Sequence, residues 1–152
     1  MIFRKAMIDD LPDIVQLLAD DELGATREQF ETPLPDTYFE AFKAIEAQTG
    51  NQLLLAVEGD SVLACLQLTI IPGLARNGLK RAQIEGVRVA KDQRGNKVGE
   101  AIFKKAIAIA ITENCGLVQL TTDKQREDAH RFYERLGFVA SHEGMKLMIE
   151  PT

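Results

Sequence analysis

The sequence predicts an α/β chain of the α+β kind, with one mixed, largely antiparallel sheet flanked by about four helices. Runs of apolar residues typical of strands alternate along the chain with segments whose apolar residues recur at helical spacing. Three strand-like runs also follow one another near the middle of the chain, which is typical of an antiparallel meander. With 152 residues, 45% of them hydrophobic and 27% charged, the chain fits a single domain over residues 1–152.

The first third of the chain reads as a strand followed by two helices. Residues 1–8 predict the strand, and apolar spacing predicts a helix over residues 10–23, which an aspartate at its start can cap. A glycine and two prolines make residues 24–35 a loop. A second helix over residues 36–48 places four apolar side chains on one face: Tyr38, Phe39, Phe42 and Ile45.

The rest of the chain begins with the meander and continues with alternating helices and strands. A polar turn at residues 58–61 separates two strands within residues 52–71, and the glycine-containing segment 72–81 leads to the third strand. Short connections throughout fit one domain with helices packed on a sheet. The elements predicted after the second strand are, in order, strand 82–90, a helix beginning near residue 98, strand 117–122, helix 127–136, and strands 138–143 and 145–150.

Composition and charge argue against several functional classes. The net charge of -5 and the pI near 5.1 disfavour general nucleic-acid binding, which rests on an excess of Lys and Arg. The sequence contains no 18-residue apolar run and no apolar stretch typical of a signal peptide, so we expect no membrane partner and a cytoplasmic location. The two cysteines are too few for a disulfide scaffold, and with the two histidines they show no metal-ligand spacing.

A short turn, RGNKVG at residues 94–99, stands where a strand-like run gives way to a helix. Backbone N–H groups at a helix start lack partners within the helix and lie at the positive end of its dipole, so they bind phosphate well. Gly95 and Gly99 allow an anion to approach this backbone, and Arg94 and Lys97 add positive charge. On these residues alone, a phosphate site and a plain turn with solvated cations both stay open. Neither the Rossmann nor the Walker glycine pattern is present.

A second motif, REDAHRFYERLGF, follows at residues 126–138. Together with IEGVRVAKDQRGNKVG at residues 84–99, it resembles the GNAT superfamily of acyl-CoA-dependent N-acetyltransferases. The family pattern has a pyrophosphate-binding turn, Q/R-x-x-G-x-G/A, and a later helix with A-x-x-F-Y-x-x-x-G-F. Lys97 departs from it where the turn usually has its first glycine, and Arg126 stands where many members have Asn. The matching residues are Arg94, Val98 and Gly99 in the turn, and Ala129, Phe132, Tyr133, Gly137 and Phe138 in the helix.

The resemblance implies acetyl-CoA as the cosubstrate, no metal, and a GNAT-like sheet with a central splay between strands 84–90 and 117–122. The pantetheine chain would pair with the backbone of the first of these strands. An N–H group there, at Val89, would bind the thioester carbonyl and later the oxyanion. The residues implied to bind the cofactor are Val87, Arg88, Val89, Arg94, Gly95, Asn96, Lys97, Val98, Gly99 and Arg126.

Two side chains are candidates for general acid and general base. Tyr133 fits the acid, because a phenol with a pKa near 10 stays protonated at neutral pH and can donate to the leaving thiolate. Glu85 is the candidate base, and strand alternation places it on one face with Gln83, Val87 and Val89. Plainer interpretations stay open: Tyr133 as a core aromatic, and Glu85 as a solvated or ion-paired carboxylate.

The resemblance implies a primary amine, on a small molecule or a peptide, as the acceptor. Family members build the acceptor pocket from loops that correspond to residues 26–35 and 75–81. Two alternative functions stay open: a CoA-binding sensor or partner-binding module with weak chemistry, and a transferase for a longer acyl-CoA. Assembly into a homodimer also stays open. Glu28, Glu31 and Asp36 would suit a cationic amine, whereas Arg76, Lys80 and Arg81 would suit an anionic group on it, so the class of amine stays open.

Overall fold

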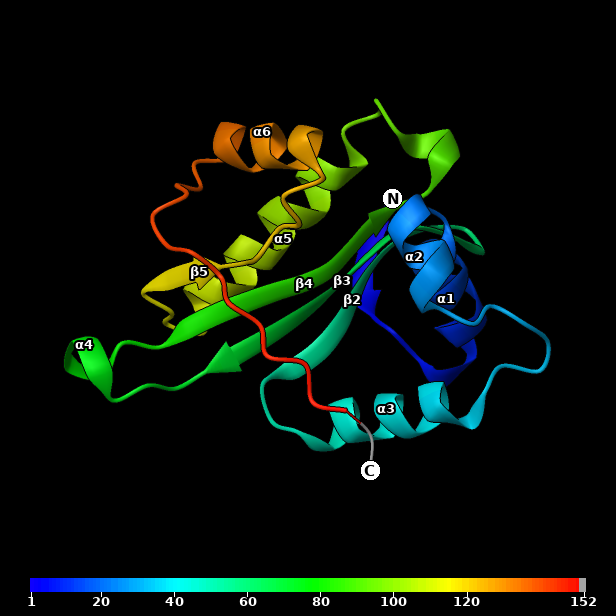
Figure 1. Cartoon of the computed structure of the whole chain (residues 1–152), viewed down its shortest axis with the longest axis horizontal. Helices are drawn as coiled ribbons and strands as arrows, with labels where there is room; N and C mark the ends of the chain where they lie inside the picture. The colour runs from blue at the N-terminus through cyan, green and yellow to red at the C-terminus, as the bar shows by residue number, and fades with distance from the viewer. Residues whose placement is uncertain (151–152) are drawn as a thin grey trace. The chain divides into compact units, whose positions relative to one another are not determined.

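The computed structural model describes residues 1–150, which form two compact units, Met1–Gln119 and a second that begins at Leu120. Figure 1 shows the strands of the first unit side by side in one sheet, with α4 projecting beyond β3 and β4. The second unit contains α6 (Glu127–Arg135). The elements of the first unit are β1 (Ile2–Lys5), the 3-10 helix η1 (Ile8–Asp10), α1 (Leu11–Ala19), α2 (Glu22–Arg27), α3 (Asp36–Ala47), β2 (Asn51–Glu58), β3 (Ser61–Ile71), α4 (Ala75–Gly78), β4 (Arg81–Val89), the 3-10 helix η2 (Lys91–Gln93), α5 (Val98–Thr112) and β5 (Leu117–Gln119).

The five strands form one mixed sheet in the order β1-β2-β3-β4-β5. All neighbours pair antiparallel except β4 and β5, which are parallel. The predicted meander of β2, β3 and β4 is therefore confirmed, as is the mixed, largely antiparallel sheet with helices packed on it. The described residues contain six α-helices rather than about four, because α4 and most of α2, both short, lie in segments predicted as loops.

Each face of the sheet is buried by a different helix. Ile14 and Leu17 of α1 pack against Leu55 and Cys65, and this side of the sheet is called the α1 face below. On the opposite side, α5 packs on β2, β3 and β4 and contributes the fully buried Phe103. Because successive strand residues point to opposite faces, this double covering explains why β2 and β3 are apolar at consecutive positions.

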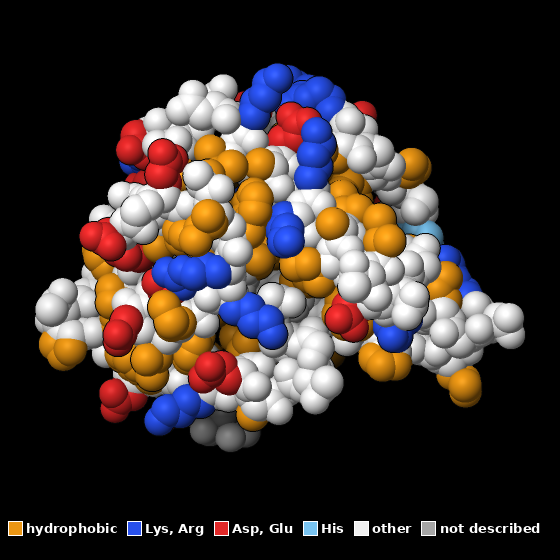
Figure 2. Space-filling model, turned by 180° about the vertical axis from the view of Figure 1, so that it is seen from behind, with side chains coloured by type: hydrophobic (Ala, Val, Ile, Leu, Met, Phe, Trp, Pro, Cys, Tyr) orange, Lys and Arg blue, Asp and Glu red, His pale blue; other side chains and the backbone are white. Residues whose placement is uncertain are grey.

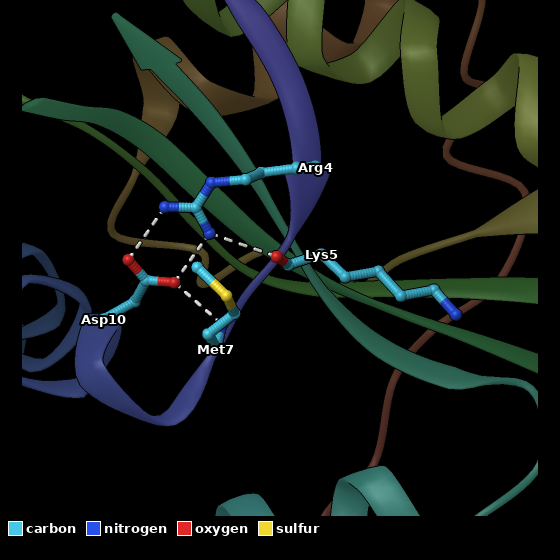
Figure 3. A network of polar contacts seen from close by, with 4 residues as sticks. All are labelled: Arg4, Lys5, Met7 and Asp10. Atoms are coloured by element: carbon cyan, nitrogen blue, oxygen red, sulfur yellow. Dashed lines mark hydrogen bonds and ion pairs between the residues drawn. The ribbon is translucent and has the colours of Figure 1, made fainter. Parts of the chain in front are cut away.

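A charged network joins β1 to η1 (Figure 3). Arg4 donates from Nη1 to Oδ2 of Asp10 at 2.7 Å and from Nη2 to Oδ1 at 2.9 Å, a bidentate pair. The same guanidinium donates to the carbonyl of Lys5, and the N–H of Met7 donates to Asp10. The Arg4 guanidinium lowers the pKa of Asp10, so this carboxylate stays charged while it orients the chain that enters α1.

The predicted single helix over residues 10–23 is interrupted, because α1 ends at Ala19 and a separate helix, α2, begins at Glu22. Asp21 caps α2 by accepting a hydrogen bond from the N–H of Gly24. An aspartate that bonds a backbone N–H three residues ahead starts a new helix rather than continuing the old one. The break places two carboxylates, Asp20 and Asp21, in the α1–α2 connection.

The predicted strands at residues 138–143 and 145–150 are also wrong, since no strand is assigned to either segment. Strand-like composition does not make a strand without a partner edge to share backbone hydrogen bonds. Strand 117–122 is shortened to Leu117–Gln119 for the same reason.

Figure 2 shows acidic, basic and apolar side chains interspersed on the face opposite to that of Figure 1. No helix within residues 1–150 has the length and apolar character needed to cross a membrane.

Candidate functional site

A bulge in β4 sets the positions of the candidate base and of the backbone expected to bind the cofactor. Glu85 pairs with Gln67 of β3, whereas Arg88 pairs with Cys65, so β4 has one more residue than β3 over this interval. Gly86 adopts φ +63°, in the left-handed region that glycine tolerates best, and this allows the bulge. Directly paired residues lie on the same face of a sheet, so Glu85 and Arg88 both lie on the α1 face.

The prediction that Glu85 and Val89 share a face is therefore wrong. Val89 pairs with Ala64, which adjoins Cys65 in β3 and so belongs to the opposite face. The extra residue shifts the alternation by one position, which a strict period of two does not foresee. Val87 lies within the bulge itself.

Beyond Gln83, the outer edge of β4 has no neighbour in the sheet that residues 1–150 form. The parallel ladder of β4 and β5 ends at the pair of Gln83 and Gln119. Ala90 donates its N–H to the carbonyl of Leu63 in β3 at 2.8 Å. Successive N–H groups of an extended chain point to opposite sides, so the N–H of Val89 points to the open edge. This edge gives the first unit the splay that the resemblance implies, with a backbone donor in it.

The connection from η2 to α5 is a tight, exposed turn. Gly95 has φ +89°, and Lys97, the residue directly before α5, also takes a left-handed conformation with φ 61° and ψ 18°. Val98 is 5% exposed and anchors the helix start in the core. No side chain caps this helix in the described chain, so its first N–H groups stay open to an anion. Arg94 and Asn96 are exposed beside them.

Two ion pairs connect the α1–α2 connection to β4 and to η2. Oδ2 of Asp21 lies 3.4 Å from Nε of Arg88, and Oδ1 of Asp20 lies 3.0 Å from Nζ of Lys91. Arg88 also donates from Nη1 to the carbonyl of Val87 at 2.8 Å. Because its side chain makes these contacts within the chain, its predicted part in cofactor binding falls to its backbone. Sequence analysis missed both pairs, because partners this far apart in the chain leave no local pattern. A shallow hollow of about 530 Å³ lies here, lined by Ala19, Asp20, Asp21, Glu22, Ala25, Lys91 and Arg94.

A row of polar side chains crosses the α1 face from β2 to β5. Its members are Asn51, Thr69, Gln83 and Gln119, each paired with the next across the sheet. Thr69 donates from Oγ1 to Oδ1 of Asn51 at 3.3 Å, and Gln119 donates from Nε2 to Oε1 of Gln83 at 2.7 Å. Glu85 is exposed two residues further along β4. The predicted shared face of Gln83 and Glu85 is confirmed, but the row depends on register, which the sequence analysis did not predict.

The second unit carries Arg126 and Tyr133. The ring of Tyr133 is half-buried and packs edge-to-face with Phe132 and Phe138, at centroid distances of 5.6 Å and 6.0 Å. These contacts fit a core aromatic, and the role of Tyr133 as the general acid stays a prediction. Arg126 is the residue directly before α6, and its side chain makes no capping hydrogen bond to that helix.

The buried Cys65 thiol is poorly suited to act as a nucleophile. Burial raises the pKa of the Cys65 thiol to about 12, so it stays protonated near neutral pH and is a weak nucleophile. Residues 1–150 contain no cluster of three or more His, Cys, Asp or Glu side chains that could hold a metal ion. Among the acceptor-loop candidates, Glu28 accepts a hydrogen bond from Tyr38 and Lys80 donates to the carbonyl of Glu113.

The chain is similar in sequence and in fold to known acetyltransferases. The sequence matches the model of the acetyltransferase (GNAT) family over residues 13–138. A solved transcriptional regulator from Bacillus halodurans C-125 is 47% identical, with a TM-score of 0.95 that covers 97% of this chain and 99% of that one. An acetyltransferase from Trypanosoma brucei has a TM-score of 0.77 over 97% of this chain and 99% of its own, and its 23% identity supports a shared fold alone.

One curated relative matches over a shorter segment. It is an aminoalkylphosphonate N-acetyltransferase from Salmonella typhimurium, 37% identical over 60 residues. These residues make up 40% of this chain and 39% of the relative, so the match spans about two fifths of the relative's length. The likeness is therefore confined to part of each molecule.

Proposed function

Because the chain belongs to the acetyltransferase (GNAT) family, we propose that it is an N-acetyltransferase that moves an acetyl group from acetyl-CoA to a primary amine by direct transfer. The observation that carries this proposal is the course of β4. Its outer edge opens beyond Gln83, and the chain that leaves this strand passes through η2 and the turn at residues 94–97 to the uncapped start of α5. A free strand edge and an anion-binding helix start thus follow each other, as a ligand with a pantetheine arm and a pyrophosphate requires.

In the proposed site, the residues of the turn bind the cosubstrate. The first N–H groups of α5 bind its phosphates, with Arg94 and Lys97 adding charge. The open edge of β4 pairs with its pantetheine arm, and the N–H of Val89 donates to the thioester oxygen and stabilises the oxyanion of the tetrahedral intermediate. The proposed roles of the implied cofactor-binding residues are otherwise as the sequence predicts, with Arg126 contacting a phosphate.

Proton transfer is assigned to two side chains. Glu85 takes the proton of the acceptor amine through a water molecule, and its position on the α1 face beside the polar row supports this role. Tyr133 returns a proton to the leaving thiolate, and it is available as the acid because a phenol with an ordinary pKa near 10 still carries its proton at neutral pH. The proposed acceptor is a small-molecule or peptide amine, and the reaction uses neither a metal nor a covalent enzyme intermediate.

A second candidate is a CoA-binding regulator with weak chemistry. The Bacillus halodurans protein that is 47% identical to this chain is a transcriptional regulator. Lys97 and Arg126, which depart from the family pattern, stand at two positions expected to contact the cosubstrate. This candidate keeps cosubstrate binding and loses turnover, so the two functions differ in a measurable way.

The test combines a binding assay with a turnover assay. Acetyl-CoA should raise the melting temperature, because a ligand selective for the folded state stabilises it by mass action. Release of free thiol from acetyl-CoA and from longer acyl-CoA thioesters is then measured with a panel of amines. Thiol release with acetyl-CoA supports the transferase, and a melting-temperature rise without turnover supports the regulator. A protein that shows neither response contradicts both.

A further inference from the structure

The polar row on the α1 face has hydrogen-bonding capacity that the described chain does not use. The side-chain carbonyl oxygen of Gln119 and the side-chain amide nitrogen of Gln83 have no hydrogen-bond partner within residues 1–150. The carboxylate of Glu85 has none there either. Gln67, which pairs with Glu85 across the sheet, donates to Asn51 and has its own carbonyl oxygen free. Half-buried amides with unused donors and acceptors are well placed to bind a polar ligand, because both kinds of group are offered side by side.

Arg81 lies at the opposite end of this surface from Glu85. It pairs with Leu117 and shares the α1 face with Gln83 and Glu85, so the polar row passes between the two charged residues. Its Nε atom is buried without a hydrogen-bond partner, and no carboxylate of the described chain pairs with its guanidinium. Arg4 and Arg88, by contrast, are paired with aspartates.

A half-buried guanidinium without an acidic partner favours an anionic ligand. Arginine has a rigid fork of donors that matches a carboxylate or a phosphate, and burial strengthens such a contact. The guanidinium also lies beside the backbone of Gly73, where an added side-chain carbon would be 3.5 Å from its Nη2 atom. Arg81 therefore leans toward the β3–β4 connection and away from Glu85.

We propose that the acceptor lies along this surface as an extended amine that carries amide or hydroxyl groups in its middle and an anionic group at its far end. Glu85 faces the amine, the row of Asn51, Thr69, Gln83 and Gln119 binds the middle, and Arg81 binds the anion. The proposal rests on the proposed acetyltransferase function and adds the class of its acceptor.

The spacing along β4 sets the length of this acceptor. Glu85 and Arg81 are four residues apart, which is about 13 Å between their Cα atoms at a rise of about 3.3 Å per residue. A chain of three residues spans about 10 Å when extended. The hydrogen bonds at its two ends, from the amine to a water molecule beside Glu85 and from the guanidinium of Arg81 to the anion, add about 3 Å each. An acceptor of roughly tripeptide length can therefore connect Glu85 to Arg81, whereas a two-carbon amine cannot.

Four amines of similar length separate the two recognition elements. Triglycine has amides and an anion, triglycinamide has amides alone, 6-aminohexanoate has an anion alone, and hexylamine has neither. With saturating acetyl-CoA, we expect kcat/KM for triglycine to exceed that for triglycinamide by about ten- to a hundredfold, the range for one charge-assisted contact. Both amide-bearing amines should exceed hexylamine.

Two variants connect this preference to the named residues. Arg81→Gln should lower kcat/KM for triglycine by about ten- to a hundredfold and leave triglycinamide unchanged, because only the anion contact is lost. Gln83→Leu should lower it for both amide-bearing amines and spare 6-aminohexanoate. Lys43→Gln, an exposed substitution on α3, is the matched control for loss of one positive charge. Circular dichroism melting curves check that all three variants fold.

The outcomes distinguish this inference from the proposed function. Turnover of hexylamine that equals turnover of triglycine overturns the inference and leaves the acetyltransferase intact, as does an equal effect of Arg81→Gln on triglycine and triglycinamide. If none of the four amines is acetylated, calorimetry of triglycine and triglycinamide binding to the acetyl-CoA-loaded protein decides. Tighter binding of triglycine than of triglycinamide that is lost in Arg81→Gln supports the acceptor surface and contradicts the enzymatic function. Equal binding of the two peptides overturns the inference.

Discussion

Replacing Lys97 with glycine should stabilise the folded protein, although a glycine substitution usually destabilises one. Its φ of 61° and ψ of 18° place it in the left-handed region, which costs a residue with a Cβ about 1–2 kcal/mol. Glycine avoids this strain but loses about 0.5–1 kcal/mol more in conformational entropy on folding. Taken at the midpoints of the two ranges, the difference predicts that Lys97→Gly raises the free energy of unfolding by about 0.5–1 kcal/mol.

The assay is thermal unfolding in the absence of ligand. For a chain of this size, 1 kcal/mol shifts the melting temperature by about 2–4 °C, so Lys97→Gly should raise it by about 1–4 °C. Lys97→Ala is the matched control, because it removes the ammonium but keeps the Cβ and the strain, and it should change the melting temperature by less than about 1 °C. If the glycine and alanine variants lower the melting temperature equally, the left-handed backbone is not a source of strain and the reasoning is refuted.

The same three proteins test the role of the Lys97 ammonium in cosubstrate binding. Lys97→Ala should weaken acetyl-CoA binding, because a charge contact to phosphate is lost while the Cβ remains. Lys97→Gly loses the same charge but lets the phosphate approach the backbone more closely, so its affinity should lie above that of the alanine variant. Equal dissociation constants for all three proteins would mean that the ammonium is solvated.

Three further predictions follow from other parts of the molecule. Gly99→Asp should abolish the rise in melting temperature caused by acetyl-CoA, because it places a negative charge and bulk at the start of α5, and an undiminished rise would show that the turn is not the phosphate site. Tyr133→Phe should lower the turnover number by roughly ten- to a thousandfold with little change in acetyl-CoA affinity, and an unchanged turnover number for an acceptor whose chemistry limits the rate would remove Tyr133 from the mechanism. Asp10→Asn should lower the free energy of unfolding at pH 7 by about 1–3 kcal/mol, as expected for loss of hydrogen bonds between charged groups. Because Arg4 lowers the pKa of Asp10 below its ordinary value of 3.8, this stabilisation is present above that value and is lost as the pH falls through the lowered pKa. The free energy of unfolding of the variant should therefore fall less steeply than that of the parent between about pH 5 and pH 2. An equally steep fall in both proteins would contradict the lowered pKa of Asp10.

Local patterns in the sequence predicted most elements of the first unit. The helical spacing of Leu11, Ile14 and Val15 predicted α1, and the three apolar runs through residue 90 predicted the antiparallel meander. These signals are reliable because one face of each element must be buried, and burial imposes a period on the chain. The segments 138–143 and 145–150 show the limit, since a strand also needs a partner edge.

Local patterns in the sequence were enough to identify the family, through the turn at residues 94–99 and the motif around Tyr133, and to suggest the candidate base Glu85 and the helix that follows the turn. Which side chains meet, by contrast, became known from the fold. The bulge at Gly86 reversed the facing of Val89, and the register aligned Gln83 with Gln119. The α1–α2 break paired Asp21 with Arg88. The physical reason is that a local period reports which face of an element is buried, whereas register, bulges and long-range ion pairs depend on segments far apart in the chain.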